Sequence, residues 1–494
     1  MPNNENDIDT TSLAQLIIQR LDGHRIDDPL YVDWLKQLVR QGCGGFIVFG
    51  GRLEPLRRLI AELQDIADTH LFIASDVECG LARQIEETTR LPCQMALAAA
   101  LYPHQEGLLI DALNVIADEC QYVGINMPLI PVLDVNLNPD NPIIATRAFS
   151  DDPTVVSWFS ERYVKVFSER GLLIAGKHFP GHGDTSIDSH ITLPVINRSR
   201  EELLSCDLLP FKRAIELGIK CIMVGHLMIP CLDKDFPASL SRPIIEGILQ
   251  AELGFKGLVI TDAMNMGALK GFGNHYIQCL IAGADVILHP EGFEDCLMRL
   301  QSGLKLGRLP AETVHRALNK IRGIKGAIIP QTCRVDFSKN SAIANSLFER
   351  APTLIKSTNA LLPLKGRHYR FYAAGQIQDD LSPLRSRFGE ILSIDSPTEG
   401  HEEVAIIALF STVSAWLGTS GISQKTRDAV REVMKRARHS IVLSFGSPYV
   451  LRHFYDADVL IAAYEASGQM QKAVLRYLDS DGPFNQNLPV TLIA

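Results

Sequence analysis

Ionisable side chains are concentrated in residues 177–190, whose sequence is Lys-His-Phe-Pro-Gly-His-Gly-Asp-Thr-Ser-Ile-Asp-Ser-His. An apolar run at residues 172–175 directly precedes them. This run predicts a buried strand, and the Pro-Gly-His-Gly that follows can continue neither a strand nor a helix. A polar loop at the end of a buried strand is where a parallel α/β barrel carries its catalytic groups.

Two chemistries are open to this loop. One residue separates Asp188 from His190, so in an extended turn the carboxylate can orient the imidazole and stabilise its charged form. Histidine and aspartate clusters also bind zinc or iron, and the candidate ligands here are His178, His182, Asp184 and His190. The first two histidines straddle Pro180-Gly181, so they do not share one face of a helix. From the residues alone, a solvated loop histidine beside a turn aspartate is the default.

The elements that must position this loop alternate between apolar strands and helical segments. Eight strands are predicted, at residues 16–21, 44–50, 71–76, 124–134, 172–175, 220–226, 257–262 and 282–289. Connections of helical length imply parallel neighbours. Polar residues stand at the strand ends: Asp76, Asp134, Lys177, His178, His226, Asp262 and His289. This convergence predicts an α/β fold, a (β/α)8 barrel of TIM type over residues 1–330. A doubly wound open sheet is disfavoured because no Gly-rich phosphate loop follows an early strand.

The pattern changes near residue 330. We expect a linker at 331–350 and a smaller α/β layer domain at 351–494. A helical stretch is predicted at 342–356. Short strands are predicted at 373–375, 404–410, 440–445 and 459–463.

Bulk properties restrict the class of protein. The 494 residues exceed one ordinary core, and 46% hydrophobic with 21% charged residues is normal for a globular protein. A net charge of −9 argues mildly against nucleic acid or an anionic membrane surface as a partner. The first residues show no secretory signal and no apolar run is long enough to span a bilayer. Ten cysteines without CxxC pairs are expected to be free thiols in a reducing cytoplasm.

Several segments together resemble one known family. The stretch from Lys177 to His190 resembles the signature loop of glycoside hydrolase family 3, in its β-N-acetylglucosaminidase branch. The segment Ile260-Thr-Asp-Ala-Met-Asn-Met-Gly resembles the family's nucleophile motif, and residues 138–149 its arginine segment. Residues 75–80, Ser-Asp-Val-Glu-Cys-Gly, resemble a sugar-binding segment but have Val77 and Cys79 where the common form has Gln and Gly. The stretches 354–364 and 446–449 resemble the family's second, α/β/α sandwich domain.

The resemblance implies roles that the residue types alone leave open. It implies that Asp262 is the nucleophile of a retaining glycosidase and that His190 is the acid/base, oriented by Asp188. It implies that Asp76, Arg147, Lys177 and His178 bind the sugar. Without it, Asp262 is better explained as a helix N-cap, Arg147 as a surface ion pair and Lys177 as a buried one. Glu78 and Arg83 could pair with each other, and His226 and Asp134 are weaker site candidates for which a structural role is the alternative.

The resemblance therefore predicts a retaining exo-β-N-acetylglucosaminidase without a cofactor. Its substrate would be a small oligosaccharide, from recycled cell-wall peptidoglycan or of chitin type, with neither nucleic acid nor membrane as a partner. Within the family, β-glucosidase and glycoside phosphorylase activities are alternatives. A metal-dependent barrel hydrolase that uses His178, His182 and His190 is the alternative from another class. A non-catalytic sugar-binding relative is disfavoured by the intact Asp262, Asp188 and His190.

Overall fold

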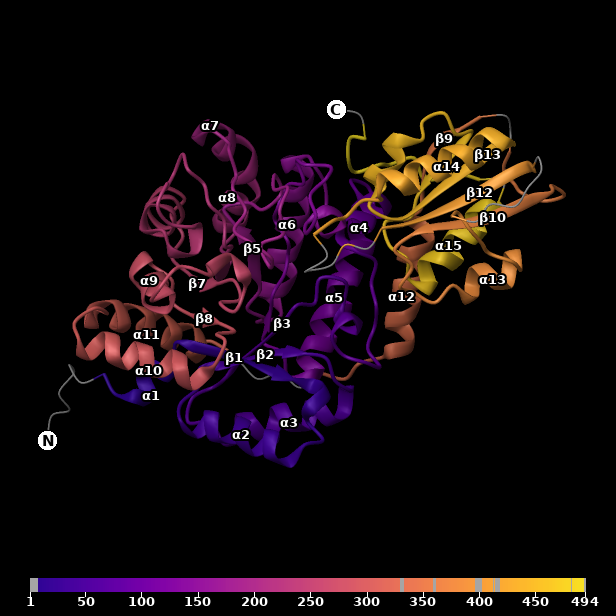
Figure 1. Cartoon of the computed structure of the whole chain (residues 1–494). Coiled ribbons are helices and arrows are strands. Elements are labelled where there is room, and N and C mark those ends of the chain that lie inside the picture. Colours follow the sequence, from indigo (N-terminus) through magenta and orange to yellow (C-terminus); the bar gives the residue numbers. More distant parts are fainter. Residues whose placement is uncertain are drawn as a thin grey trace, which may run out of the picture.

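The first two thirds of the chain form an α/β unit of short parallel strands (Figure 1). The computed structural model describes residues 8–328, 333–358, 361–395, 402–411, 413, 418–480 and 482–492. The strands of this unit are β1 Ile17–Asp22, β2 Gly45–Phe49, β3 Phe72–Ser75, β4 Met127–Pro128, β5 Ala175–Phe179, β6 Cys221–Val224, β7 Leu258–Thr261 and β8 Ile287–Leu288.

Strand pairing makes the sheet curl. One parallel sheet has the order β4-β3-β2-β1-β8, and a second has the order β5-β6-β7. Two isolated parallel bridges connect them, Val132 with Lys177 and Ile260 with Val286. Because every pair is parallel, the carboxyl ends of the strands lie together on one side of the curled sheet.

The helices that follow the strands bury apolar faces against them. In α3, Leu56, Ile60 and Leu63 recur at helical spacing and are fully buried. The helices of this unit are α1 Thr10–Ala14, α2 Pro29–Arg40, α3 Leu53–Asp65, α4 Gln94–Leu101, α5 Glu106–Val123, α6 Pro153–Glu169, α7 Arg200–Glu202, α8 Leu209–Glu216, α9 His275–Ala282, α10 Phe293–Lys305 and α11 Ala311–Gly326, with π-helical turns at Leu203–Asp207 and Pro243–Glu252. No helix in the described part of the chain has the length and hydropathy needed to span a bilayer.

Each of the eight predicted strand regions overlaps a strand, but two predicted lengths and one boundary are wrong. The regions 124–134 and 282–289 hold only the two-residue strands β4 and β8. The strand predicted at 172–175 instead begins at Ala175, so Lys177 and His178 lie inside β5 and not in the loop after it. Backbone pairing explains the shift, because Lys177 donates its N–H to Pro131 and accepts from Leu133. A strand prediction based on runs of apolar residues cannot include polar strand residues such as Lys177 and His178.

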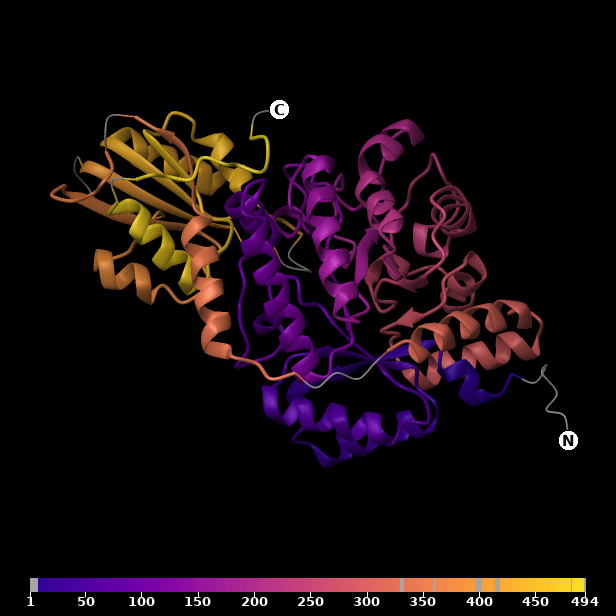
Figure 2. The same cartoon turned by 180° about the vertical axis from the view of Figure 1, so that it is seen from behind.

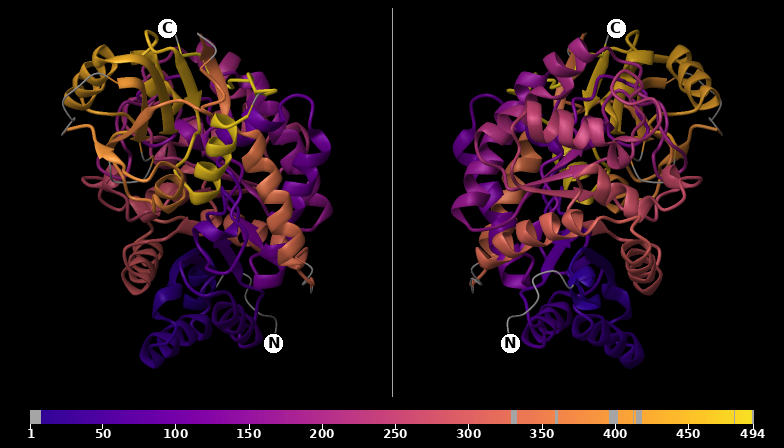
Figure 3. Two further views of the ribbon diagram at one scale, coloured as in Figure 1. Left: turned by 90° about the vertical axis from the view of Figure 1, so that its right-hand side faces the viewer. Right: turned by 90° about the vertical axis from the view of Figure 1, so that its left-hand side faces the viewer.

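The last third of the chain forms a second sheet. Its strands are β9 Thr353–Ser357, β10 Tyr369–Gly375, β11 Leu392–Ser393, β12 Glu402–Ser411, β13 Ala437–Gly446 and β14 Val459–Ala462, in the order β11-β10-β12-β13-β14-β9. All pairs are parallel except β14 with β9. The helices α13 Ser382–Phe388, α14 Gln424–Arg436 and α15 Gly468–Leu478 accompany it, with α14 on one side of the sheet and α13 and α15 on the other (Figure 1). This sheet lies at the opposite end of the molecule from α2 and α3 (Figure 3).

The segment predicted as a linker contains a helix. Within 331–350, residues Phe337–Arg350 form α12, which packs on α4, α5 and α15 between the two sheets (Figures 1 and 2). The helix predicted at 342–356 is present, but it ends at Arg350, and residues from Thr353 onward belong to β9. Strands β9 and β11 were not predicted. Residues 329–332, which include the start of the predicted linker, lie outside the described part of the chain.

Buried polar contacts join the second sheet to the first unit. The Glu465 carboxylate, 10% exposed, accepts hydrogen bonds from the Arg90 guanidinium at 3.1 Å and from the Cys93 N–H at 2.8 Å. Asn487 donates its side-chain amide to the carbonyl oxygen of Tyr102 at 2.7 Å. The core of the second sheet also includes Met95 of α4. The two parts are therefore packed against each other through both polar and apolar side chains.

We expect Glu465→Ala to lower the midpoint of thermal unfolding, with a loss of about 1–3 kcal/mol, because a buried N–H and a guanidinium lose their acceptor. The control is Glu349→Ala, which removes an exposed ion pair with Arg476 and is expected to change the midpoint little. Calorimetry of both variants tests this. Equal midpoints would show that the Glu465 contacts do not hold the two parts together.

Candidate active site

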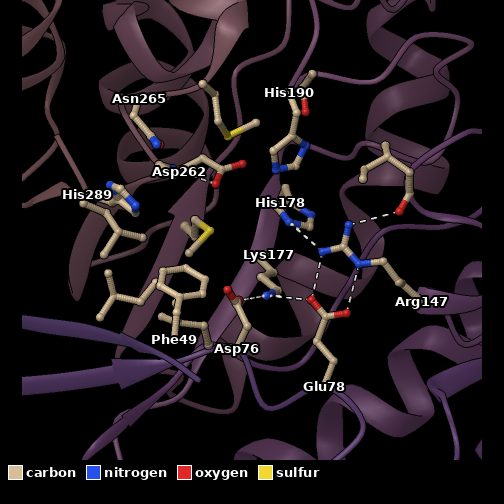
Figure 4. Close-up of a pocket in the computed structure, with 18 of the residues that line it drawn as sticks. Phe49, Asp76, Glu78, Arg147, Lys177, His178, His190, Asp262, Asn265 and His289 are labelled. Carbon is tan, nitrogen blue, oxygen red and sulfur yellow. Dashed lines mark hydrogen bonds and ion pairs between the residues drawn. The ribbon is translucent and has the colours of Figure 1, made fainter. Parts of the chain in front are cut away.

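The predicted site residues gather at the carboxyl ends of the first unit's strands. They surround a cavity of about 350 Å³, which is lined by Arg20, Ile47, Phe49, Asp76, Glu78, Arg83, Gln84, Leu129, Ile143, Arg147, Lys177, His178, His182, Ser189, His190, Met223, Asp262, Ala263, Asn265, Met266, Leu288 and His289. Of the seven residues that the resemblance assigns to the site, only Asp188 is absent from this lining; it is buried and contacts His190. Figure 4 shows the side chains of Asp262 and His190 facing the cavity from neighbouring segments.

Asp262 follows β7 directly, and its carboxylate is held by the backbone. Its Oδ1 accepts the N–H of Ala263 at 2.7 Å. Burial alone would raise the pKa of Asp262, but His178, His226 and His190 stabilise the carboxylate and lower the pKa to about 2. The group is therefore ionised at neutral pH, as a carboxylate nucleophile must be.

Asp188 and His190 form the pair that their spacing predicts. The Nδ1 of His190 lies 2.9 Å from Oδ1 of the fully buried Asp188, which also accepts the His190 N–H at 2.9 Å. Because a carboxylate only accepts, Nδ1 carries the proton. The imidazole itself is 25% exposed and lines the cavity. This arrangement leaves the ring positioned for proton exchange at the cavity wall.

Four charged groups form a buried network on the other wall (Figure 4). The ammonium of Lys177, 2% exposed, lies 2.6 Å from Asp76 and 2.8 Å from Glu78. Glu78 also accepts two hydrogen bonds from the Arg147 guanidinium, at 2.8 and 2.9 Å. Burial would raise the pKa of Glu78, but Arg147 and Lys177 overcome this and hold it well below its usual range. Glu78 thus contacts both cations, and Asp76 supplies the second negative charge that balances them.

The predicted pairing of Glu78 with Arg83 is wrong. Glu78 turns toward Arg147 and Lys177, while Arg83 lies exposed at the cavity rim. Arg147 is not a surface residue, because its guanidinium forms a bidentate ion pair with the Glu78 carboxylate. Sequence distance explains the error, because Arg147 and Lys177 reach Glu78 only after three separate strands have assembled.

His178 is oriented by Asp134, whose carboxylate is fully buried. Nδ1 of His178 donates to Asp134 at 2.7 Å, and Nε2 lies 3.4 Å from the Arg147 guanidinium. Asp134 also accepts the N–H of His182 at 2.7 Å. Asp134 therefore positions His178 and the loop after β5 from outside the cavity lining. His226, the other weaker candidate, is buried and contacts Ser239 and the Ala263 carbonyl.

The loop after β5 is fixed by its neighbours along the strand ends. A Cβ at Gly183 would lie 1.7 Å from the Val135 carbonyl oxygen, so only glycine permits this approach. The Asn141 amide donates to the carbonyl oxygens of His182 and Gly183 at 2.9 and 3.0 Å. Asn141 is itself held by the second unit, because the Ser420 hydroxyl donates to the Asn141 carbonyl oxygen at 2.6 Å. The second unit thus supports the loop, and none of its described residues lines the cavity.

Other lining residues escaped prediction. Apolar and polar groups from several segments complete the cavity wall, among them Phe49, Met223, Asn265 and Met266. Asn265 and Met266 follow Asp262 within the motif at residues 260–267, so their closeness to Asp262 in the sequence could have identified them as lining residues. Phe49 ends an ordinary apolar strand, and nothing in its sequence distinguishes it from core residues.

The hydrogen bonds do not favour the metal hypothesis. Both ring nitrogens of His182 lie 3.0 Å from hydroxyl groups, those of Thr185 and Ser189. Nδ1 of His178 is taken by Asp134. Among the residues that the structure describes, no group of three or more His, Cys, Asp or Glu side chains is arranged to hold a metal ion.

Comparison with known proteins agrees with this site. Residues 14–324 match the model of the glycosyl hydrolase family 3 N-terminal domain, so the chain belongs to this family. Beta-hexosaminidase A of Pseudoalteromonas piscicida is 33% identical over a match that covers 63% of this chain and 57% of that protein. The chain thus spans little more than half the length of that relative. A beta-N-acetylglucosaminidase/beta-glucosidase of Cellulomonas fimi is 25% identical, covering 94% of this chain and 90% of that protein.

A solved structure extends the similarity over both units. The family 3 beta-N-acetylglucosaminidase of Paenibacillus sp. str. FPU-7 is 26% identical with a TM-score of 0.84, covering 98% of this chain and 99% of that one. The resemblance to family 3 that the motifs indicated is confirmed.

We expect Glu78→Gln to destabilise the protein by about 3–5 kcal/mol at neutral pH, because two buried cations lose a counter-charge. The pKa of Glu78 is lower in the folded than in the unfolded protein. Its carboxylate therefore stabilises the folded state fully at pH values above the unfolded pKa, and this stabilisation is lost as the pH falls through the folded pKa. The difference in melting temperature from wild type should therefore narrow below about pH 4. Asp76→Asn, at a more exposed carboxylate, is the control and should cost less. Equal losses in the two variants would contradict this account.

Proposed function

We propose that this protein is a retaining exo-β-N-acetylglucosaminidase. The observation that carries the proposal is the placement of Asp262 and the Asp188-supported His190 on one cavity beside the Asp76, Arg147, Lys177 and His178 cluster. In this mechanism Asp262 attacks the anomeric carbon and forms a covalent glycosyl-enzyme, while His190 protonates the departing oxygen. His190 then removes a proton from water, which releases the sugar. The names of the relatives support N-acetylglucosamine as the sugar.

The proposal extends to the fold and the setting of the reaction. We propose that the curled sheet of residues 1–330 is a (β/α)8 barrel of TIM type and that residues 351–494 form an α/β/α sandwich. The pairings and the bridges between the two parallel sheets support the barrel. We propose cell-wall or chitin-type fragments as substrates and the cytoplasm as the compartment, for which ten unpaired cysteines are the support.

Specificity and cofactor independence are tested with a panel of aryl β-glycosides. We expect faster release from the N-acetyl-β-glucosaminide than from the β-glucoside, and unchanged rates after exhaustive chelation. Added phosphate should not change the product from N-acetylglucosamine to its 1-phosphate. A preference for the β-glucoside, formation of the 1-phosphate, or activity lost on chelation and restored by zinc would each favour the corresponding alternative.

The role of His190 is tested by the leaving group. An alkoxide cannot depart without a proton, so His190→Ala should slow hydrolysis of an alkyl or sugar aglycone roughly 10²–10⁴-fold. A nitrophenolate needs little assistance, so the glycosyl-enzyme on Asp262 should accumulate with a burst of phenol. Azide, which needs no deprotonation, should restore turnover and give the β-glycosyl azide.

Two further variants separate the roles of the carboxylates. Asp188→Asn should act like His190→Ala but more weakly, because the imidazole remains and only its orientation and charge stabilisation are impaired. Asp262→Ala should show neither a burst nor azide rescue to the β product. If His190→Ala slows activated and unactivated substrates equally, without a burst, His190 is not the acid/base.

A further inference from the structure

A second cavity, of about 450 Å³, lies at the opposite end of the parallel strands. Its walls come from the α1 region, from the segments that precede β2 and β3, and from the end of α11: Asp9, Thr11, Ser12, Gln15, Val39, Gly42, Cys43, Ala67, Asp68, Thr69, His70, Leu71, Leu318, Ile321, Arg322, Lys325 and Gly326. Asp76 and Asp262 follow the carboxyl ends of their strands, whereas residues 42–43 and 67–71 precede the amino ends. The size is in the range of small-molecule sites.

The distinguishing group of this cavity is Lys325, a buried ammonium. Lys325 is 7% exposed and donates to the Gln15 side-chain oxygen and to the Gly44 carbonyl oxygen, each at 2.8 Å. Its Nζ lies 4.8 Å from the centre of the Phe72 ring. An ammonium has three donors, so one N–H has no protein acceptor among the described residues.

This charge has no carboxylate partner in the described part of the chain. All of its protein contacts are neutral groups, and the nearby Cys43 thiol is kept protonated because burial raises its pKa to about 11. Burial lowers the pKa of Lys325 itself to about 8, so the side chain is still mostly cationic at neutral pH. An isolated buried charge is costly unless a counter-charge or a ligand compensates for it.

The surrounding groups fit an anion. Gln15 is fixed with its oxygen toward Lys325 and its amide nitrogen 2.6 Å from the Gly42 carbonyl oxygen. Arg322, exposed on the same helix as Lys325, adds a second cation, and His70 adds an imidazole. Two carboxylates also line the cavity, Asp9 and Asp68, but both are exposed, and Asp9 accepts the Ser12 N–H at 2.7 Å. The charge of Lys325 is therefore buried at the base of the cavity, while Arg322 and the two carboxylates are exposed.

We propose that this cavity binds a small organic anion, with its carboxylate or phosphate group against the Lys325 ammonium and Arg322 closing over it. The hydroxyl groups of Thr11, Ser12 and Thr69 line the same cavity and suit a polar body on such a ligand. The site is separate from the sugar cavity and does not depend on the function proposed for it.

The test is the binding of three probes to the full chain: malonate, inorganic phosphate and glucose 6-phosphate, each against sodium chloride at equal ionic strength. We expect at least one probe to raise the melting temperature by about 2 °C or more and to give a saturable isotherm in calorimetry. Malonate and glucose 6-phosphate separate a carboxylate ligand from a phosphate ligand, and inorganic phosphate shows whether the organic body contributes.

Variants show whether Lys325 is responsible. Lys325→Met keeps the length of the side chain and removes the charge, and should weaken the probe at least tenfold. Arg322→Gln, at an exposed position with no ion pair among the described residues, should reduce the shift in melting temperature by at least half. Lys305→Met, at an exposed lysine of α10, is the matched control and should bind as wild type does. The proposal is overturned if no probe exceeds chloride, or if Arg322→Gln and a folded Lys325→Met bind as tightly as wild type.

Discussion

The buried charge network around Lys177 is the constraint on which the site depends. Its ammonium is almost completely removed from water, and this is tolerable only because Asp76 and Glu78 lie within 2.8 Å. Glu78 in turn holds Arg147, and Arg147 approaches His178. The carboxylates follow β3, Arg147 lies in the segment after β4, and Lys177 and His178 lie within β5, so the charges balance only when these three segments are correctly paired. The same contacts that stabilise the curled sheet therefore hold the donors and acceptors that face the cavity.

The loop that carries Asp188 and His190 is supported from three directions. Asp134 accepts the N–H of His182, the Asn141 amide holds two carbonyl groups of the loop, and the backbone of Gly267 donates to the His190 carbonyl. Asn141 is itself held by Ser420, and the hydroxyl of Tyr449 contacts the Asn136 side chain at 3.1 Å. Residues of the second unit therefore act on the loop through an intermediate segment. This gives the second unit a physical connection to the loop, although none of its described residues lines the cavity.

The curled sheet has a buried lysine at each end, and the two lysines have different kinds of partner. At the carboxyl ends, Lys177 is neutralised by carboxylates of the chain itself. At the amino ends, Lys325 has only neutral acceptors among the described residues. The contrast between two buried lysines in one core is what marks the second cavity as a place for an anion.

The sequence alone determined the approximate positions of the first unit's eight strands, the family, and the local Asp188–His190 pair. These follow from apolar periodicity and from residues two positions apart, which are properties of short segments. Only the tertiary structure decided that Glu78 neutralises Lys177 and Arg147 and not Arg83, because that choice depends on which strand ends meet. It also decided that Lys177 and His178 lie within β5, since backbone pairing with residues 131–133 extends the strand into a polar stretch. Phe49 and Lys325 face cavities for the same reason: burial and partners arise from packing between segments far apart in the chain.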